Sequence, residues 1–541
     1  MTTSQTPPPP ETPATADGAD DTTPVMSKRQ IWTVLAGLMS AMLLAALDQT
    51  VVSTALYTIA RGLAPGHGLG EVSWVVTAYL LAVTATMPFY GKISDLYGRR
   101  PVLFVAMTLF LAGSALCGIA PGLGALIAFR TLQGIGAGGL MTLVMAIIAD
   151  MIPPRERGRY SGLGVAVMAV SSLLGPLAGG FFTQSHVFLG FTTSWRWAFW
   201  INVPIGIAAL ALVMKVLRLP PQPRRGHRMD FAGAGLLTGA VCAILLGTVW
   251  GGDRYAWDSA QIVGLGATAV VFLVAFQYVE RRAAEPVFAP RLFRQRVFRL
   301  ANPLLFIIGF ANMGSVVYVT LYLQLADGLS PTSAGLHLMP MTFGMAIASI
   351  TAGRLVSRLG RYKVFLVSGI VCAVTAMLLL ADLHVGSPSW LVSLDILLLG
   401  LGLGQVMGIP ALAVQNSVDR ADMGAATSAT TFTRSMGQAF GAAAFGAILT
   451  ARLTVNLPGG TGALAGHGGT VDSGTLAKLP ADLRDRVIEA YVTSYDTVFL
   501  VAAVVLALGL LLALRIPEVP LRGKAPLAPA KPLAQKPLGQ G

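Results

Sequence analysis

Long apolar runs separated by short polar segments cover most of this chain. A membrane-spanning helix needs about 20 mostly apolar residues, and fourteen segments of the chain meet this requirement. The predicted spans are 31–55, 73–91, 101–120, 124–149, 160–182, 197–217, 231–250, 260–279, 298–323, 333–353, 363–382, 390–415, 424–450 and 495–515. Turn residues such as Pro153-Pro154 and Gly251-Gly252 interrupt the runs. The pattern therefore predicts an all-α membrane protein.

The basic residues are distributed unequally between the two sets of connections. When the N-terminus is placed inside, the inner segments hold 29 of the 38 Lys and Arg residues and the outer segments hold 7. Cytoplasmic loops carry such an excess of Lys and Arg. An error of one span would move every later loop to the other side of the membrane and abolish the excess, so the bias also supports the even number of spans. We therefore predict a multi-pass protein of the cytoplasmic (inner) membrane of a bacterium, with both termini cytoplasmic. Charge spread over loops also explains the net charge of +13 without nucleic acid as a partner.

Two loops share a pattern that indicates an internal repeat. Gly91–Arg100 follows the second span and Gly353–Tyr362 follows the tenth, with the shared spacing Gly-[Lys/Arg]-[Ile/Leu]-x4-Gly-Arg. Matching halves are typical of transporters built from repeats, so we predict two six-helix pseudo-repeat bundles and two inserted helices. The predicted segments are a disordered cytoplasmic tail at 1–26, a bundle at 27–218, the inserted spans at 219–282, a second bundle at 283–516 with an outer loop at 451–493, and a second disordered tail at 517–541.

Composition and motifs exclude several classes of function. The chain is 54% hydrophobic and 12% charged, whereas soluble domains are about 25% charged. The Cys and His residues show no metal-ligand spacing, and no GxxxxGK[ST] loop for ATP occurs. The GxGxxG match at Gly134–Gly139 lies inside an apolar span, so it does not indicate a dinucleotide site. Without a catalytic constellation, we expect a protein that is not an enzyme and uses no metal or cofactor.

Two charged residues fall inside predicted spans at comparable heights. A charge at the centre of a spanning helix costs at least ~2.5–3.5 kcal/mol, so by default it marks a proton relay, an ion path or a substrate contact. At ~1.5 Å per residue, Asp48 lies ~26 Å above the inner end of its span and Arg130 lies ~9 Å below the outer end of its own. The family resemblance set out below implies that both spans, and with them Asp48 and Arg130, line one central cavity, and on that ground we predict that the two residues interact directly or through water. The pair either changes the proton affinity of Asp48 between conformations or is a static structural pair.

Several motifs resemble those of one transporter family. They are Leu47–Val52, Gly91–Arg100, Arg130–Gly136, Gly164–Gly180, and Trp195–Trp197 with Asn202–Pro204. From about Met39 to Ile516 the chain resembles the major facilitator superfamily, and specifically its fourteen-span drug:proton antiporter branch of the EmrB/QacA type. Ser53-Thr54 depart from the branch's more usual Asn-Val. The resemblance implies export by alternating access, but these motifs name no substrate.

The resemblance also implies roles for individual residues. Proton coupling falls to Asp48 and Arg130, a conformational latch to Gly91, Asp95, Gly98, Arg99 and Arg100, and the fifth-span antiporter motif to Gly164, Gly175, Pro176, Gly179 and Gly180. Gly91 and Gly98 permit a tight reversal, and Asp95 can face the positive end of a nearby helix. The alternative to the latch is a simple turn with solvated charges, and the alternative for the fifth-span motif is ordinary helix packing. For the fifth span, the family role is a sealed contact between the two halves.

By the same resemblance, spans 1, 4, 9 and 12 line a central cavity. The candidate cavity residues are Asn312, Tyr318, Tyr322, Gln324, Asp395, Gln405 and Met407. Aromatic rings and flexible Met side chains suit varied apolar ligands, although each residue could equally face lipid or another helix. Arg434 lies near mid-membrane with Asp395 as a candidate partner, and bracing of the structure is as good an explanation as coupling. The scarcity of acids disfavours an obligately dicationic substrate.

These observations lead to one functional hypothesis and two rivals. We expect a proton-coupled antiporter, working as a monomer, that exports small lipophilic drugs or antibiotics and takes its energy from the proton gradient. Its partners are then the substrate, protons and membrane lipid. One rival is a transporter of a defined metabolite or peptide, and the other is a translocase of lipids or amphiphiles that enter from the bilayer.

Overall fold

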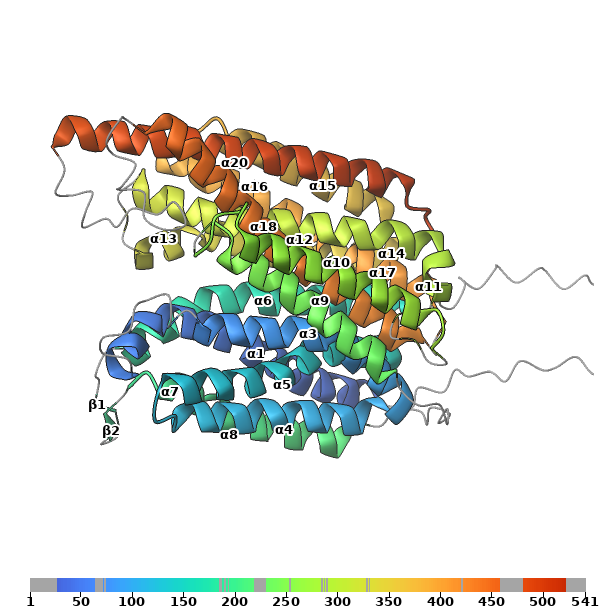
Figure 1. Cartoon of the computed structure of the whole chain (residues 1–541). Coiled ribbons are helices and arrows are strands. Elements are labelled where there is room, and N and C mark those ends of the chain that lie inside the picture. Colours follow the sequence, from blue (N-terminus) through green and yellow to red (C-terminus); the bar gives the residue numbers. More distant parts are fainter. Residues whose placement is uncertain are drawn as a thin grey trace, which may run out of the picture.

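The computed structural model describes most of the chain between residues 27 and 521. Within that stretch, the residues outside the description are 64–71, 73, 184–186, 189–190, 193, 218–229, 253, 284–285, 287, 289, 327–328, 330, 420–421 and 458–479. The predicted tail 1–26 and most of the predicted tail 517–541 also lie outside the described residues. The described chain enters and leaves on the same side of the molecule (Figure 1), which we call the terminal end, and the opposite side is the far end.

The first half of the chain forms one bundle of long helices. Its elements are α1 (Lys28–Leu63), α3 (Trp74–Tyr97), α4 (Arg99–Gly118), α5 (Leu123–Met151), α6 (Pro154–Thr183), the two-stranded hairpin β1 (Val187–Phe188) and β2 (Phe191–Thr192), α7 (Trp197–Trp200) and α8 (Asn202–Val216). Their inward faces share one apolar cluster that includes Leu38, Phe110 and Leu140. A single residue, Gly98, separates α3 from α4, and its φ of 93° favours glycine.

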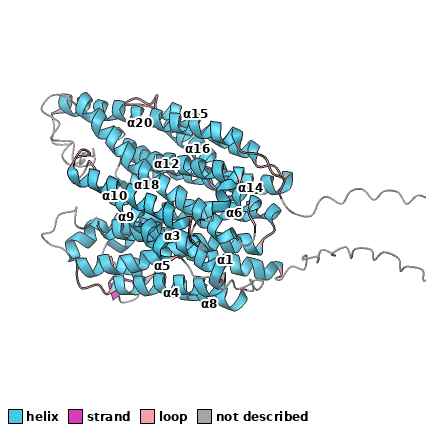
Figure 2. Ribbon diagram, turned by 45° about the vertical axis from the view of Figure 1, so that its right-hand side comes forward, coloured by secondary structure: helices cyan, strands magenta, loops and turns pink. Residues whose placement is uncertain are grey.

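The second half forms a comparable bundle. Its helices are α11 (Pro290–Arg294), α12 (Arg296–Leu325), α13 (Pro331–His337), α14 (Met339–Leu359), α15 (Lys363–Leu380), α16 (Ser389–Val406), α17 (Ile409–Ser417), α18 (Met423–Asn456) and α20 (Ala481–Arg515). Figure 2 shows both bundles as layers of long, nearly aligned helices. Each bundle has its own apolar core, and another cluster joins Val165 and Ala169 of α6 to Met345 and Ala352 of α14.

The two inserted helices, α9 (Phe231–Trp250) and α10 (Ala260–Glu280), pack against each other. A side chain caps the N-terminus of each helix. Asp230 accepts a hydrogen bond from Gly233 N at 2.8 Å, and Ser259 accepts one from Ile262 N. Leu237 and Leu245 of α9 share an apolar cluster with Ala85 of α3 and Met436 of α18. The insertion therefore lies beside the seam where the two halves meet.

The predicted spans coincide with helices, with three corrections. Thirteen helices of the described chain are long and apolar enough to span a membrane, and α18, which is not among them, occupies the remaining predicted span. The predicted span 390–415 is divided between α16 and α17 around Met407 and Gly408. The predicted outer loop 451–493 is partly helical, because α18 continues to Asn456 and α20 begins at Ala481, and its centre lies outside the described residues.

Candidate functional site

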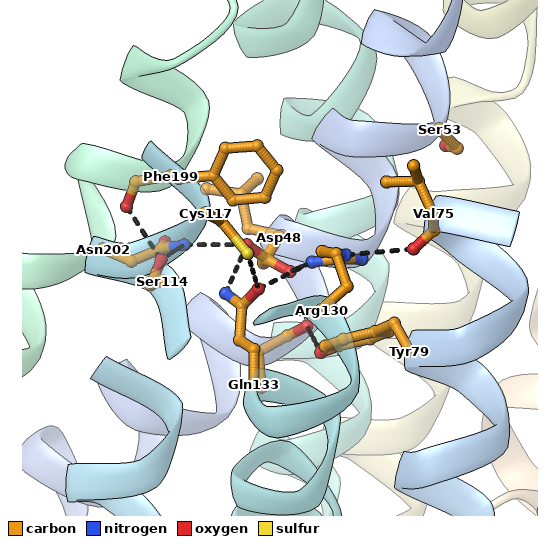
Figure 3. Close-up of polar contacts among 12 residues, drawn as sticks. Asp48, Ser53, Val75, Tyr79, Ser114, Cys117, Arg130, Gln133, Phe199 and Asn202 are labelled. Carbon is orange, nitrogen blue, oxygen red and sulfur yellow. Dashed lines mark hydrogen bonds and ion pairs between the residues drawn. The ribbon is translucent and has the colours of Figure 1, made fainter. Parts of the chain in front are cut away.

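The predicted pair of intramembrane charges is in direct contact. A nitrogen of the Arg130 guanidinium, Nη1, donates to Oδ2 of Asp48 (Figure 3). Asp48 is 1% exposed and Arg130 is fully buried, so the ion pair lies in a dry environment where an unpaired charge is costly. The predicted contact is therefore confirmed, whereas its role in coupling stays a prediction.

Two amide side chains complete the coordination of the Asp48 carboxylate. Its other oxygen, Oδ1, accepts from Gln133 Nε2 at 2.9 Å and from Asn202 Nδ2 at 2.8 Å. Asn202 also donates to Ser114 Oγ at 3.1 Å. Helices α1, α4, α5 and α8 thus meet at one carboxylate. The sequence placed Gln133 and Asn202 in family motifs without giving either a partner, and buried amides inside apolar spans were the available signal.

Further contacts of Arg130 also come from the first bundle. Its Nε donates to Val75 O at 3.2 Å, and its guanidinium carbon lies 3.9 Å from the centre of the Tyr79 ring. Glycines permit this packing: a Cβ at Gly134 would lie 2.6 Å from Tyr79 O, and one at Gly136 would collide with the backbone of Phe110. The glycine-rich stretch of α5 therefore allows α5 to pack closely against both α3 and α4.

A cavity of about 580 Å³ lies between the two halves, within the range of pockets for drug-sized ligands. The first half contributes Met42, Gln49 and Thr50 of α1, while α9 contributes residues such as Thr248. The other half contributes residues of α12, α14, α17 and α18. The cavity is therefore lined by both bundles and the insertion.

The ion pair does not lie on this cavity, which corrects the sequence-based expectation. Neither Asp48 nor Arg130 is among its lining residues, although Gln49 and Thr50 are. Adjacent residues of an α-helix point about 100° apart, so one face of α1 lines the cavity while Asp48 points into the first bundle. Substrate in the cavity can contact α1 but not the carboxylate directly.

The structure places only some of the predicted cavity residues at the cavity. Asn312 and Met407 line it, whereas Tyr318, Tyr322, Gln324, Asp395 and Gln405 do not. Tyr318 and Tyr322 are buried in the core of the second bundle, where Tyr322 donates to His384 O at 3.2 Å. Gln405 accepts from Ser368 Oγ at 2.9 Å between α15 and α16. Assignment of a residue to a cavity-lining span was insufficient because each helix has several faces.

Arg434 has no carboxylate partner among the described residues. The predicted pairing with Asp395 is wrong: the two residues form no ion pair, and Asp395 is 2% exposed on α16, away from the cavity. Arg434 instead lines the cavity from α18, and its Nε has no hydrogen-bond partner within the described chain.

The predicted latch connects the two halves at the terminal end. Asp95 accepts from the backbone N–H groups of Gly424 and Ala425, at 3.1 and 2.9 Å, at the start of α18. Arg99 binds both Asp95, at 2.6 Å, and Asp150, at 2.8 Å. A carboxylate at the positive end of a helix is the arrangement proposed from the sequence.

Other parts of the latch prediction change. Gly91 and Asp95 lie within α3, so Gly98 alone makes the reversal between α3 and α4. A Cβ at Gly91 would collide with the carbonyl of Gly424, and the residue is needed for close approach. Arg100 donates to Met214 O of α8 at 2.5 Å, within its own half.

Two glycines of the fifth-span motif, Gly164 and Gly175, pack inside the first half. A Cβ at Gly175 would collide with Thr50 of α1, and one at Gly164 with Met145 of α5. Gly179 is buried in α6, while the side-chain surroundings of Pro176 and Gly180 are outside the description. The predicted sealing role is therefore not found at Gly164 or Gly175.

The contact between halves on α6 lies nearer the terminal end. A Cβ at Gly353 would collide with Gly158 O, and Ser349 Oγ donates to Gly162 O at 3.3 Å. Arg157 adds a hydrogen bond to Gln415 O at 3.2 Å. Together with the latch, these contacts close the terminal end of the molecule.

Comparisons with known proteins agree with this architecture. The family model described as Major Facilitator Superfamily matches residues 38–230 and 216–442. An uncharacterized MFS-type transporter of Mycobacterium tuberculosis (strain H37Rv) is 40% identical over 502 residues, covering 92% of this chain and 71% of that protein. Multidrug resistance protein 3 of Bacillus subtilis is 33% identical over 488 residues, covering 88% of this chain and 93% of that protein.

A solved structure is also similar in fold. The proton:xylose symporter XylE, bound to 6-bromo-6-deoxy-D-glucose, superposes with a TM-score of 0.60 at 16% identity. The match covers 91% of this chain and 97% of that one. At this identity the likeness concerns the fold alone.

Proposed function

Because this chain belongs to the major facilitator superfamily of multi-pass membrane transporters, we propose that it exports small lipophilic compounds in exchange for protons. The observation that carries the proposal is the cavity of about 580 Å³ between the halves, rich in Met and closed at the terminal end. Flexible Met side chains adapt to varied apolar ligands. The name of the Bacillus subtilis relative supports drug efflux as the activity.

The proposed orientation places the terminal end in the cytoplasm of a bacterium. The excess of Lys and Arg in the connections at that end supports it. In this orientation the described conformation is closed toward the cytoplasm, and the latch must open for substrate to enter from inside. Export then requires the two halves to alternate around the cavity, as in other transporters built from repeats.

We assign proton binding to Asp48. A proton on its carboxylate removes the negative charge that Arg130 faces, and this changes the stability of the packing among α1, α4, α5 and α8. Since α1 also lines the cavity through Gln49 and Thr50, movement of this helix connects the carboxylate to the substrate. A proton taken up at Asp48 from outside and released inside supplies the energy for one step of export.

The test compares wild type with Asp48→Asn in proteoliposomes that contain a trapped pH-sensitive dye. Compounds from a panel of lipophilic antibiotics are added, and compound-dependent proton movement is followed together with efflux from cells. We expect wild type to couple the two, and Asp48→Asn to insert into the membrane but lose proton-driven efflux. Asp382→Asn, which changes an exposed acid outside the site, is the matched control. Full efflux by Asp48→Asn would exclude Asp48 as the essential proton carrier.

A further inference from the structure

The cavity carries a single formal charge among its described lining residues, and that charge is positive. Its described walls contain hydroxyl, amide and apolar side chains, and Arg434 is the one ionisable residue among them. No Asp or Glu occurs among the described residues that line it. The apolar part is dominated by the thioethers of Met42, Met87, Met141, Met145, Met168, Met313, Met345 and Met407.

Arg434 is fixed in this position by the packing of α18 against α12. A Cβ at Gly309 would collide with Arg434 O, and Cβ atoms at Gly437 and Gly441 would collide with the backbone carbonyls of Phe306 and Phe310. These close contacts along one face of α18 prevent the helix from rotating. The adjoining face, with Thr430, Thr431, Arg434, Ser435 and Gln438, is held toward the cavity.

The neighbours of Arg434 leave its charge uncompensated. Gln438 donates to Asn312 Oδ1 at 3.3 Å, and Ser435 points its hydroxyl to Met87 Sδ at 3.6 Å. Neither contact supplies an acceptor to the guanidinium, and its Nε has no partner in the described part of the chain. Arg434 is half-buried, and a cation withdrawn from water without a counter-charge is unfavourable, so an anion that enters the cavity relieves a cost that a neutral or cationic ligand leaves in place.

We propose that the cargo of this transporter is an amphipathic organic anion whose carboxylate, sulfonate or phenolate is bound by Arg434. The planar guanidinium donates two parallel hydrogen bonds to the two oxygens of a carboxylate or sulfonate, or hydrogen bonds to the single oxygen of a phenolate, while the Met-lined walls accept the apolar part. A lipophilic cation is repelled by Arg434, and no Asp or Glu among the described lining residues attracts it. The inference rests on the proposed function, because it names the substrate class of the same cavity.

The test measures binding to the purified full chain with three probes of different charge. Anilinonaphthalene sulfonate is the anion, phenylnaphthylamine is the same scaffold without the sulfonate, and tetraphenylphosphonium is the cation. Equilibrium dialysis against empty micelles removes the contribution of detergent. A charge-assisted hydrogen bond contributes enough for about 10- to 100-fold in affinity, so we expect wild type to prefer the anion over its neutral analogue by that factor.

Variants separate the charge of Arg434 from the shape of the cavity. We expect Arg434→Gln to lose the anion preference about 10- to 100-fold while phenylnaphthylamine binding changes little. Arg434→Lys should retain part of the preference, and Arg434→Glu should favour tetraphenylphosphonium. Arg358→Gln removes an exposed arginine of α14 outside the cavity and should leave all three affinities unchanged.

A second variant leaves Arg434 in place, so that the proposal can still be tested if the Arg434 variants fail to fold. Gln438→Glu places a carboxylate one helical turn away on the same face, and its charge should compete with the anion and weaken its binding. An unchanged ratio of anion to neutral affinity in both Arg434→Gln and Gln438→Glu, or tightest wild-type binding of the cation, would overturn the proposal. Failure of proton-driven export with intact anion selectivity would refute the proposed function alone.

Discussion

The latch at Asp95 gives a quantitative prediction about the conformational equilibrium. In the described conformation, its carboxylate accepts two backbone hydrogen bonds from the start of α18 and pairs with Arg99 at 2.6 Å. Asp95→Asn keeps the size of the side chain, but it removes the negative charge and leaves one carbonyl oxygen for two N–H groups. The closed terminal end should therefore lose stability relative to any conformation in which α3 and α18 are separated.

The magnitude follows from the contacts that are lost. A hydrogen bond to a charged group contributes about 1.5–3 kcal/mol, and loss of one such bond shifts a two-state equilibrium by about 10- to 150-fold. Hydrogen–deuterium exchange of a peptide covering Met423–Thr430 should accelerate by a factor in this range. Labelling of a cysteine at position 357, in a background without Cys117, Cys242 and Cys372, should accelerate in parallel because Ser357 lies at the contact with α6.

Wild-type rates of both hydrogen–deuterium exchange and cysteine labelling in Asp95→Asn would show that Asp95 does not stabilise the closed terminal end. Asp258→Asn, which alters an exposed acid between α9 and α10, provides the control for a general effect of charge. If exchange accelerates throughout the protein and not at the start of α18 in particular, Asp95 stabilises the whole fold and is not a latch.

Two further predictions concern close packing and the buried carboxylate. Gly353→Ala places a methyl group against the Gly158 carbonyl, so it should separate α14 from α6 and increase labelling at the terminal end. Gly335→Ala, where no atom lies within 4 Å of the added carbon, should have no such effect. Equal labelling of the cysteine at position 357 in the two variants would show that the methyl group at position 353 does not separate α14 from α6. Asn202→Ala removes a donor at 2.8 Å from buried Asp48 and should lower the free energy of unfolding by about 1–3 kcal/mol. The free energy of unfolding of Asn202→Ala, obtained by thermal unfolding, is compared with those of wild type and Asn202→Asp. Wild-type values in both variants would show that Asn202 does not stabilise the Asp48 carboxylate.

The ion pair and the latch illustrate what residue spacing can predict. Asp48 and Arg130 lie at comparable heights because each helix rises by a constant distance per residue, and this height, together with the family resemblance that places both spans at one cavity, predicted the contact. The helix-end partner of Asp95 followed from the electrostatics of helix termini. In both cases the rule depends on distance along a helix, which sequence contains directly.

The direction in which a side chain points around its helix was less accessible. Asp48 was expected at the cavity and points into its own bundle, while Arg434 was expected near Asp395 and faces the cavity. In soluble helices a polar face marks the side exposed to water. In a membrane, lipid-facing and core-facing positions are both apolar, so the pattern does not distinguish them.

The sequence by itself determined the class of molecule, the approximate helix limits, the placement of two charges at one height and the repeated loop. These features depend on local hydropathy, charge and rise per residue, which neighbouring helices do not alter. Only the tertiary structure decided that Gln133 and Asn202 share the Asp48 carboxylate, that Gly164 and Gly175 pack within one half, and that Arg434 is the charge among the described lining residues of the cavity. Those facts depend on how each helix is rotated against its neighbours, and that rotation is set by the close packing of glycines and side chains from distant parts of the chain.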